Sequence, residues 1–304
     1  MNTIAQEKKI ATQTLKVNAK NNVLQNYIEI SSLPINERKS FFSSISATDK
    51  ADIFKLHLAL QFVKRPNLTD EQKELILETI PTLSSESYKK NNSQIVEKVQ
   101  QEAMMLQQKA RIVFSKQEGF EIFASLGGDT TDIDMLQSYQ YISDFDMTAR
   151  KYIFGKALAK DKSNLWKVHL ALYLAKHSEL TKEQKKIILE GITLFTPELY
   201  KIPVKSWSGE IETDNEAIQL FTKRAQEVFS KEKGAEVFEK LGGAESQYSR
   251  NLDEIESSML RADNCGCSRA SDWCWETCIG VGCKQTTWGC GTGWSYPCDH
   301  NGCS

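Results

Sequence analysis

The hexapeptide Lys-Leu-His-Leu-Ala-Leu at residues 55–60 returns at 167–172 as Lys-Val-His-Leu-Ala-Leu, 112 residues later. The same offset relates Leu-Thr-Asp-Glu-Gln-Lys at 68–73 to Leu-Thr-Lys-Glu-Gln-Lys at 180–185. Two further segments recur in the same order along the chain. A repeat of this length indicates a duplicated subdomain and not a short solenoid unit.

The later pair of matches shows a change in the offset. Val-Phe-Ser-Lys at 113–116 returns at 228–231, and Leu-Gly-Gly at 126–128 returns at 241–243, in each case 115 residues later. The second copy has therefore gained three residues, and we expect them in the loop around 203–212.

Helix signals flank the repeated segments. Thr69 with Gln72, and Thr181 with Gln184, fit capping boxes ahead of apolar-periodic runs. The step 196–197, Thr-Pro, is typical of a helix start. The paired glycines after each copy are natural helix C-caps, because glycine adopts the left-handed conformation without steric cost.

The fold class that follows is mainly α, with a duplicated all-helical N-terminal domain and a small, disulfide-rich, loop-dominated C-terminal module. The expected domain organisation is an N-terminal helical segment, the first helical copy, the second helical copy, a linker with a short helix, and the cysteine-rich module. Their expected ranges are 1–32, 33–128, 129–243, 244–263 and 264–304.

All eight cysteines lie in the last domain, and residues 1–264 contain none. A unit of about 40 residues cannot fold on a hydrophobic core alone, which favours four disulfides. Two four-cysteine zinc sites are the alternative, but no Cys-x₂-Cys knuckle is present, so we assign no metal and no cofactor. The predicted disulfide cysteines, whose pairing the spacing leaves open, are Cys265, Cys267, Cys274, Cys278, Cys283, Cys290, Cys298 and Cys303.

The same module is rich in aromatic residues and nearly neutral. Its two basic and three acidic residues give a net charge of −1, whereas a membrane-lytic peptide needs a basic face. Tryptophan and tyrosine are common anchors at interfaces, although some of these rings could simply cover the disulfides. The candidate recognition aromatics are Trp273, Trp275, Trp288, Trp294 and Tyr296.

Three segments of the module carry a family resemblance: Asn-Cys-Gly-Cys-Ser at 264–268, Ala-Ser-Asp-Trp-Cys at 270–274 and Gly-Cys-Gly-Thr-Gly-Trp at 289–294. They resemble the bacteriocin fulvocin C and its related proteins. The resemblance covers about residues 264–304 and implies a disulfide-bonded antibacterial peptide whose mature chain begins near the first cysteine. It marks the eight cysteines as disulfide partners and no residue as catalytic.

Processing would separate this peptide from the helices. Leu-Gly-Gly at 241–243 resembles a double-glycine leader signal, but its partner at 126–128 precedes no peptide, which favours a structural role for both. We instead expect cleavage in the linker, because nicking concentrates in segments with few contacts. The candidate processing residues are Arg261, Ala262, Asp263 and Asn264.

Other functional classes find little support. His57 and His169 occupy equivalent places in apolar helices and are expected to be satisfied core residues and not metal ligands. No catalytic triad, paired carboxylates or phosphate-binding loop is visible, so we predict no enzymatic activity. The net charge of −2 predicts no nucleic-acid partner, and no apolar run is long enough to be a transmembrane segment.

We therefore expect a secreted bacteriocin-like (antibacterial) protein or precursor whose stapled C-terminal peptide is the effector. Its helical domain would be a carrier, an export or folding scaffold, or a silencing domain that covers the aromatic face of the module. Its partner would be a target-cell envelope component or receptor, and export or processing machinery is a further candidate. Extracellular location is inferred from cysteine usage, although no signal peptide is visible. One alternative is a non-lytic secreted or cell-surface protein whose cysteine-rich end recognises a protein or glycan. Another is a zinc-binding interaction protein.

Overall fold

Capped helices make up most of the described chain, as the sequence predicts. The structure is a computed structural model that describes residues 22–89, 93–201, 216–243, 273, 278–279, 286–298 and 302–303. The expected linker, the processing residues and the expected insertion region around 203–212 lie outside these residues. Among the described helices, none combines the length and apolarity needed to cross a membrane.

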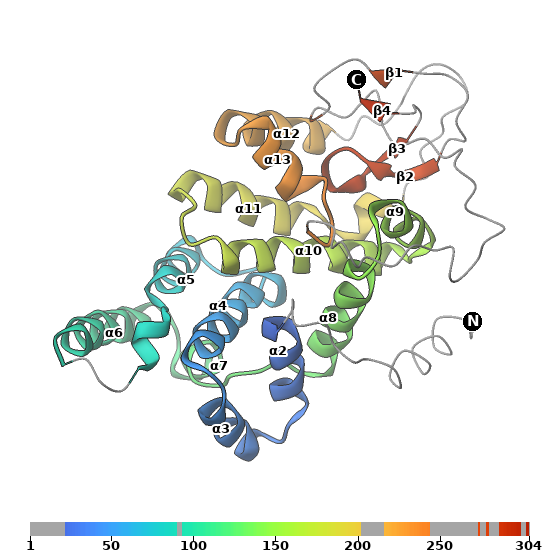
Figure 1. Ribbon diagram of the computed structural model, residues 1–304. Coiled ribbons are helices and arrows are strands. Elements are labelled where there is room, and N and C mark those ends of the chain that lie inside the picture. Colours follow the sequence, from blue (N-terminus) through green and yellow to red (C-terminus); the bar gives the residue numbers. More distant parts are fainter. Residues whose placement is uncertain are drawn as a thin grey trace.

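The helices form two successive sets, which follow one another in Figure 1 from blue to orange. The first set is α2 (Asn22–Ser32), α3 (Ile35–Ser44), α4 (Ala47–Lys64), α5 (Asp70–Thr82), the 3₁₀ helix η2 (Ser85–Tyr88), α6 (Ser93–Val113) and α7 (Lys116–Phe123). The second set is α8 (Thr130–Ser143), α9 (Met147–Lys156), α10 (Ala159–Lys176), α11 (Lys182–Leu194), the 3₁₀ helix η3 (Pro197–Tyr200), α12 (Glu216–Val228) and α13 (Lys231–Phe238).

The repeat begins earlier than the matching sequence segments. Tyr27 on α2 bonds to His57 on α4, and Tyr139 on α8 bonds to His169 on α10, so α2 and α8 are equivalent helices. The described part of the N-terminal segment, 22–32, is therefore built into the first copy. We refer to residues 22–128 as repeat 1 and to residues 129–243 as repeat 2.

The two repeats pack through their central helices, α4 and α10, which lie side by side in Figure 1. Half of the residues of α4 and two thirds of those of α10 are buried. One apolar core runs through both repeats and also includes three rings of the C-terminal module, Trp273, Trp294 and Tyr296. The module and repeat 2 thus share a continuous hydrophobic core.

The caps follow the sequence in most places. The predicted capping boxes at Thr69 and Thr181 are present, with the side chain of each accepting from a backbone N–H of the first turn. At Thr196 a helix does begin, with Pro197 at its first position, but it is a 3₁₀ helix and the threonine side chain makes no capping bond.

The prediction that the paired glycines are helix C-caps is wrong. α7 ends at Phe123 and α13 at Phe238, and the capping residues are Ala124 and Glu239. The glycine pairs lie further on, in the turns that leave each repeat. Gly127 and Gly242, the first glycine of each pair, have positive φ angles, and an arginine side chain described below approaches each of them closely.

The described part of the C-terminal module contains two short antiparallel ladders. Strands β1 (Cys278–Ile279) and β4 (Gly302–Cys303) pair, and strands β2 (Thr286–Cys290) and β3 (Tyr296–Cys298) pair with an irregular register. The second ladder, with the 3₁₀ turn η5 (Thr292–Trp294) between its strands, lies beside α9 and α13 in Figure 1.

Candidate functional site

The segment 290–298, which we call the tryptophan loop, is closed at its base by a disulfide. Cys290 and Cys298 are bonded, and their Cα atoms lie 5.3 Å apart. Gly291 and Gly293 have φ angles of 68° and 65°, and Trp294 also has a positive φ of 50°. Left-handed backbone is unfavourable for a bulky residue, so contacts around the indole must hold Trp294 in place.

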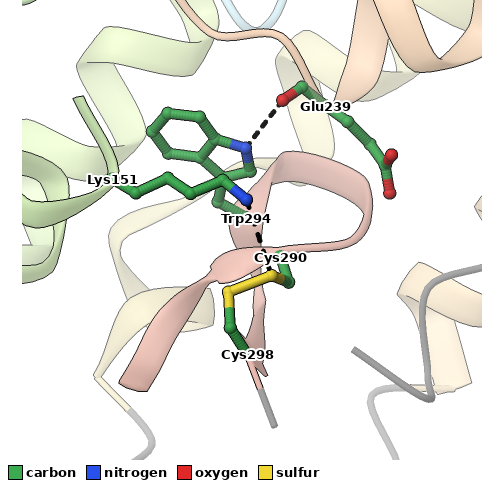
Figure 2. The surroundings of a disulfide bond; sticks show 5 residues. All are labelled: Lys151, Glu239, Cys290, Trp294 and Cys298. Carbon is green, nitrogen blue, oxygen red and sulfur yellow. Dashed lines mark hydrogen bonds between the residues drawn. A yellow bond between two sulfur atoms is a disulfide. The ribbon is translucent and has the colours of Figure 1, made fainter. Parts of the chain in front are cut away.

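Those contacts come from repeat 2. The Trp294 side chain is 1% exposed, and its Nε1–H donates to the backbone carbonyl of Glu239 at 2.7 Å, as Figure 2 shows. Its ring packs edge-on against Phe154 and Trp166, with centroid distances of 5.2 and 5.8 Å. The pocket satisfies both the apolar ring and its one polar atom, which is what a specific tryptophan site requires.

Trp273 enters the same interface from a distant part of the module. It is 2% exposed and stacks on Phe238 of α13. Its Nε1–H donates to Thr292 Oγ1 at 2.9 Å, and the hydroxyls of Thr292 and Thr222 lie 2.9 Å apart. Thr222 also reaches the carbonyl of Ile218 at 2.8 Å, so a chain of hydrogen bonds joins the module to α12. Every polar group in this buried chain has a partner, as burial demands.

Two close backbone approaches complete the interface. Tyr200 donates its hydroxyl to the carbonyl of Gly293 at 3.0 Å. Gly293 itself lies against Phe195, where a Cβ atom would approach the ring to 2.6 Å. On the other side, a Cβ at Gly234 would lie only 1.9 Å from the Trp273 ring. Glycine is therefore required sterically on both sides of the contact.

A lysine lies beside the disulfide. Lys151 Nζ on α9 is 3.7 Å from Cys290 Sγ, and Figure 2 shows it pointing to the base of the tryptophan loop. Burial lowers the pKa of this ammonium group, and the nearby Glu239 partly counteracts the effect. The base of the loop is thus fixed against repeat 2 as well as its tip.

Beneath this interface lies the buried polar centre of repeat 2, which repeat 1 duplicates. His169 Nδ1 is 2.9 Å from the Tyr139 hydroxyl, and its Nε2 is 3.1 Å from the Val237 carbonyl. A tyrosine O–H donates to Nδ1 only if Nδ1 carries no proton, so we assign the Nε2–H tautomer. Burial lowers the pKa of His169 to about 3 and that of His57 to about 4. Both histidines are buried, neutral core residues, which confirms the sequence prediction.

An arginine clamp joins the ends of each repeat. In repeat 2 the Arg150 guanidinium is fully buried and donates to the carbonyls of Phe145, Ser143, Leu241 and Gly243 at 2.7–2.9 Å. In repeat 1 the Arg38 guanidinium makes the equivalent bonds to Leu33, Ser31, Leu126 and Gly128. The Leu-Gly-Gly segments supply two carbonyls to each clamp. A Cβ at Gly127 or Gly242 would lie 2.6 or 2.9 Å from the arginine, which explains both glycines.

The predicted site residues divide into three groups. Cys290, Cys298, Trp273, Trp294 and Tyr296 are brought together at this interface, where the aromatic rings are buried and not presented to solvent. Cys278 and Cys303 are backbone partners in the β1–β4 ladder, and Trp288 lies on β2, but the side chains of these three are not described. The remaining predicted residues lie outside the described part of the chain: Cys265, Cys267, Cys274, Cys283, Trp275, Arg261, Ala262, Asp263 and Asn264.

Sequence reasoning missed the residues of repeat 2 that receive the loop. Tyr200, Thr222 and Glu239 carry no recognisable motif, and Glu239 takes part through its backbone. The arginine clamp did leave a signal, because Arg38 and Arg150 are 112 residues apart, as the histidines are.

Within the described residues, no three histidine, cysteine, aspartate or glutamate side chains gather where they could hold a metal ion. The chemistry of the site is that of a docking surface, with aromatic rings, hydroxyls and carbonyls closing on one another. No family model matches this chain, and no curated protein or solved structure is significantly similar to it.

Proposed function

We propose that this chain is a secreted, bacteriocin-like antibacterial protein or precursor, whose disulfide-stapled C-terminal module is the effector. The helical repeats are its carrier and hold the aromatic face of the module out of solvent. The observation that carries the proposal is the burial of Trp294 and Trp273 in repeat 2, with both indole N–H groups bonded.

The argument starts from the energetics of exposed aromatic rings. Tryptophan side chains are effective anchors on a target only while they are accessible. In the intact chain the tryptophan loop is already bonded to Tyr200, Thr222 and Glu239. The intact chain is therefore the silent form, and the module becomes active when it leaves repeat 2.

The same observation weighs against the binding-protein alternative. A cell-surface protein that recognised a glycan through Trp273, Trp294 or Tyr296 would need these rings exposed, and each is at most 3% exposed. The bacteriocin hypothesis requires exposure only after release. It also agrees with the family resemblance of residues 264–304.

The test compares the intact chain with the released module. A variant with a specific protease site at 261–264 is oxidised, purified and spotted on lawns of a broad bacterial panel, before and after cleavage. We expect growth inhibition from the cleaved sample that is absent from the intact sample and is lost on reduction of the disulfides. Equal treatment of the wild-type chain with the protease is the matched control.

Two results would contradict the proposal. The first is no inhibition by the oxidised, released module on any strain. The second is equal inhibition by the intact chain, which would remove the silencing role of the helical domain. Mass spectrometry before and after reduction accompanies the assay, because four disulfides add about eight hydrogens on reduction.

A further inference from the structure

Repeat 1 contains an open groove at the place where repeat 2 receives the module. The groove has a volume of about 910 Å³ and lies between the end of α5, η2, α6 and α7. Its walls include Leu83, Tyr88, Gln107, Gly119 and Phe123. Figure 1 shows these helices on the side of the molecule away from the C-terminal module.

The polar positions of the groove correspond to those that hold the tryptophan loop. Tyr88 is the counterpart of Tyr200, whose hydroxyl donates to Gly293. Gln107 is the counterpart of Thr222, which bonds to the module through Thr292. An amide side chain can donate and accept, so Gln107 can replace the threonine hydroxyl in this role.

The ring-binding positions correspond as well. Gly119 is the counterpart of Gly234, which makes room for the Trp273 indole, and Phe123 is the counterpart of Phe238, on which that indole stacks. Among the described residues, a Cβ at Gly119 would meet only the Phe114 Cβ, at 3.8 Å. The space that an indole fills in repeat 2 is therefore open in repeat 1.

The groove also leaves apolar surface exposed. Phe120, whose counterpart in repeat 2 is Ala235, is 54% exposed at the groove wall. Ala124 is the counterpart of Glu239, whose backbone carbonyl accepts from Trp294. A backbone acceptor does not depend on the side chain, so this feature survives the substitution. An exposed ring beside an unfilled groove indicates a binding surface.

We propose that this groove is a second docking site for the cysteine-rich module, and that its occupant is the module of a second copy of this chain. Each chain carries one module and two equivalent docking surfaces, one on each repeat. Its own module occupies the surface on repeat 2. Charge supports the same occupant, because Arg111 and Lys116 line the groove and the module has a net charge of −1. The proposal rests on the equivalence of the repeats, so it stands whether or not the module kills bacteria.

The first test asks whether the groove binds the loop. The probe is a fluorescein-labelled peptide of residues 273–298, which contains both docked tryptophans, with the Cys290–Cys298 disulfide formed and the other three cysteines replaced by serine. It is titrated with the full chain and followed by fluorescence anisotropy. We expect saturable 1:1 binding, at least tenfold weaker in Gly119→Trp, which fills the groove, and about fivefold weaker in Tyr88→Phe, which removes one hydrogen-bond donor.

The control for this titration is Gly155→Trp, because Gly155 is an exposed helical glycine where an added Cβ atom would have no neighbour within 4 Å in the part of the chain that the structure describes. It should bind the peptide like the wild type. An absence of binding, or binding that Gly119→Trp and Tyr88→Phe both leave unchanged, would overturn the assignment of the groove.

The second test identifies the occupant. Gly234→Trp places an indole where Trp273 packs, so it displaces the chain's own module from repeat 2. We expect this variant to associate in sedimentation velocity, at concentrations where the wild type is monomeric. The double variant Gly119→Trp/Gly234→Trp should return to the monomer, because the docking surfaces of both repeats are then blocked.

The double variant separates specific docking from non-specific hydrophobic association. Association that persists in it would come from the exposed rings themselves and would overturn the proposal. A Gly234→Trp chain that stays monomeric would show that the module does not dock on a second copy, and would overturn it also. Neither readout involves growth inhibition, so failure here is distinct from failure of the proposed function.

Discussion

Repeats 1 and 2 share a buried polar centre and differ at the face formed by η2 or η3 with the last helices of the repeat. Each centre has a tyrosine–histidine pair, a histidine bond to a backbone carbonyl, and an arginine clamp on a Leu-Gly-Gly turn. Both clamps use the same geometry, although Arg150 is fully buried and Arg38 is half-buried. We call this buried polar centre, with its arginine clamp, the frame of the repeat. Both repeats have kept it.

The face beside the frame is filled in one repeat and open in the other. In repeat 2 it holds the tryptophan loop, with Phe195, Thr222 and Glu239 in contact, and in repeat 1 the same positions leave a groove. The frame and the docking face are therefore separable parts of each repeat. The residues that keep each repeat folded recur, whereas only some of the residues that receive the module recur. Substitutions in each part can test this separation.

The largest effect should come from the docked indole. Trp294→Ala is expected to remove about 3–5 kcal/mol from the free energy that holds the module on repeat 2, because the substitution empties a packed pocket. Trp294→Phe keeps most of the packing and loses the bond to Glu239, for about 1–1.5 kcal/mol. Hydrogen exchange of residues 286–298 measures both. Exchange that is unchanged in Trp294→Ala would show that the loop is not held by this contact.

The second largest effect should be the loss of stability when an arginine clamp is removed, and it should differ between the two repeats. Arg150→Met leaves four buried carbonyls without their donor and should lower the free energy of unfolding by about 3–4 kcal/mol. Arg38→Met acts at a half-buried site where water can substitute, so about 1–2 kcal/mol is expected. Urea titrations of the two variants measure the difference. Equal losses would contradict the view that burial of the clamp is specific to repeat 2.

The histidines predict a loss of stability in acid. Their folded pKa values, about 4 for His57 and about 3 for His169, lie below the ordinary value of 6.5. The unfolded chain therefore binds protons that the folded chain does not, so the stabilisation is complete above pH 6.5 and declines as the pH falls toward the folded values. Each histidine should cost about 1.4 kcal/mol per pH unit, or about 2 kcal/mol at pH 5.

Urea titrations between pH 5 and 7.5 test this dependence, because this pH range lies above the pKa of most carboxylates. His57→Gln and His169→Gln should each flatten the curve by about half. The result that contradicts the prediction is a wild-type chain whose stability between pH 5 and 7.5 matches that of the double variant.

The smallest effect should come from a single hydroxyl of the docking face. Thr222→Val keeps the shape of the side chain and removes the link between Thr292 and α12, for about 1 kcal/mol of docking free energy. Thr193→Val, at an exposed position on α11, is the matched control and should change stability by less than about 0.5 kcal/mol. Exchange rates of the tryptophan loop compare the two variants.

Much of the frame could be predicted from the sequence. The capping boxes at Thr69 and Thr181 and the buried histidines depend on contacts within one helix or on a repeated apolar pattern, which a sequence displays directly. The sequence does not separate a helix C-cap from the role that Gly127 and Gly242 play, because both require a glycine. A helix C-cap favours glycine because of its left-handed backbone, whereas at Gly127 and Gly242 an arginine side chain also leaves no room for a Cβ atom.

The docking face could not be predicted, because its partners are distant in the chain and chemically ordinary. Trp294 bonds to a carbonyl 55 residues away, and Tyr200 bonds to one 93 residues away. The module's excess of tryptophan indicates an interface, and coverage of its aromatic face by the helical domain is one of the roles that the sequence suggests, but the residues of repeat 2 that bury these rings are not visible in the sequence.

The sequence by itself determined that the chain is mainly helical and duplicated, and that its cysteines are confined to one small module, since these properties follow from local periodicity and composition. Only the tertiary structure decided that the aromatic face of this module lies on repeat 2 and that the equivalent face of repeat 1 is open. The physical reason is that such a contact depends on shape and on hydrogen-bond partners brought together from separate segments of the chain. No one of these segments carries a pattern that reveals the others.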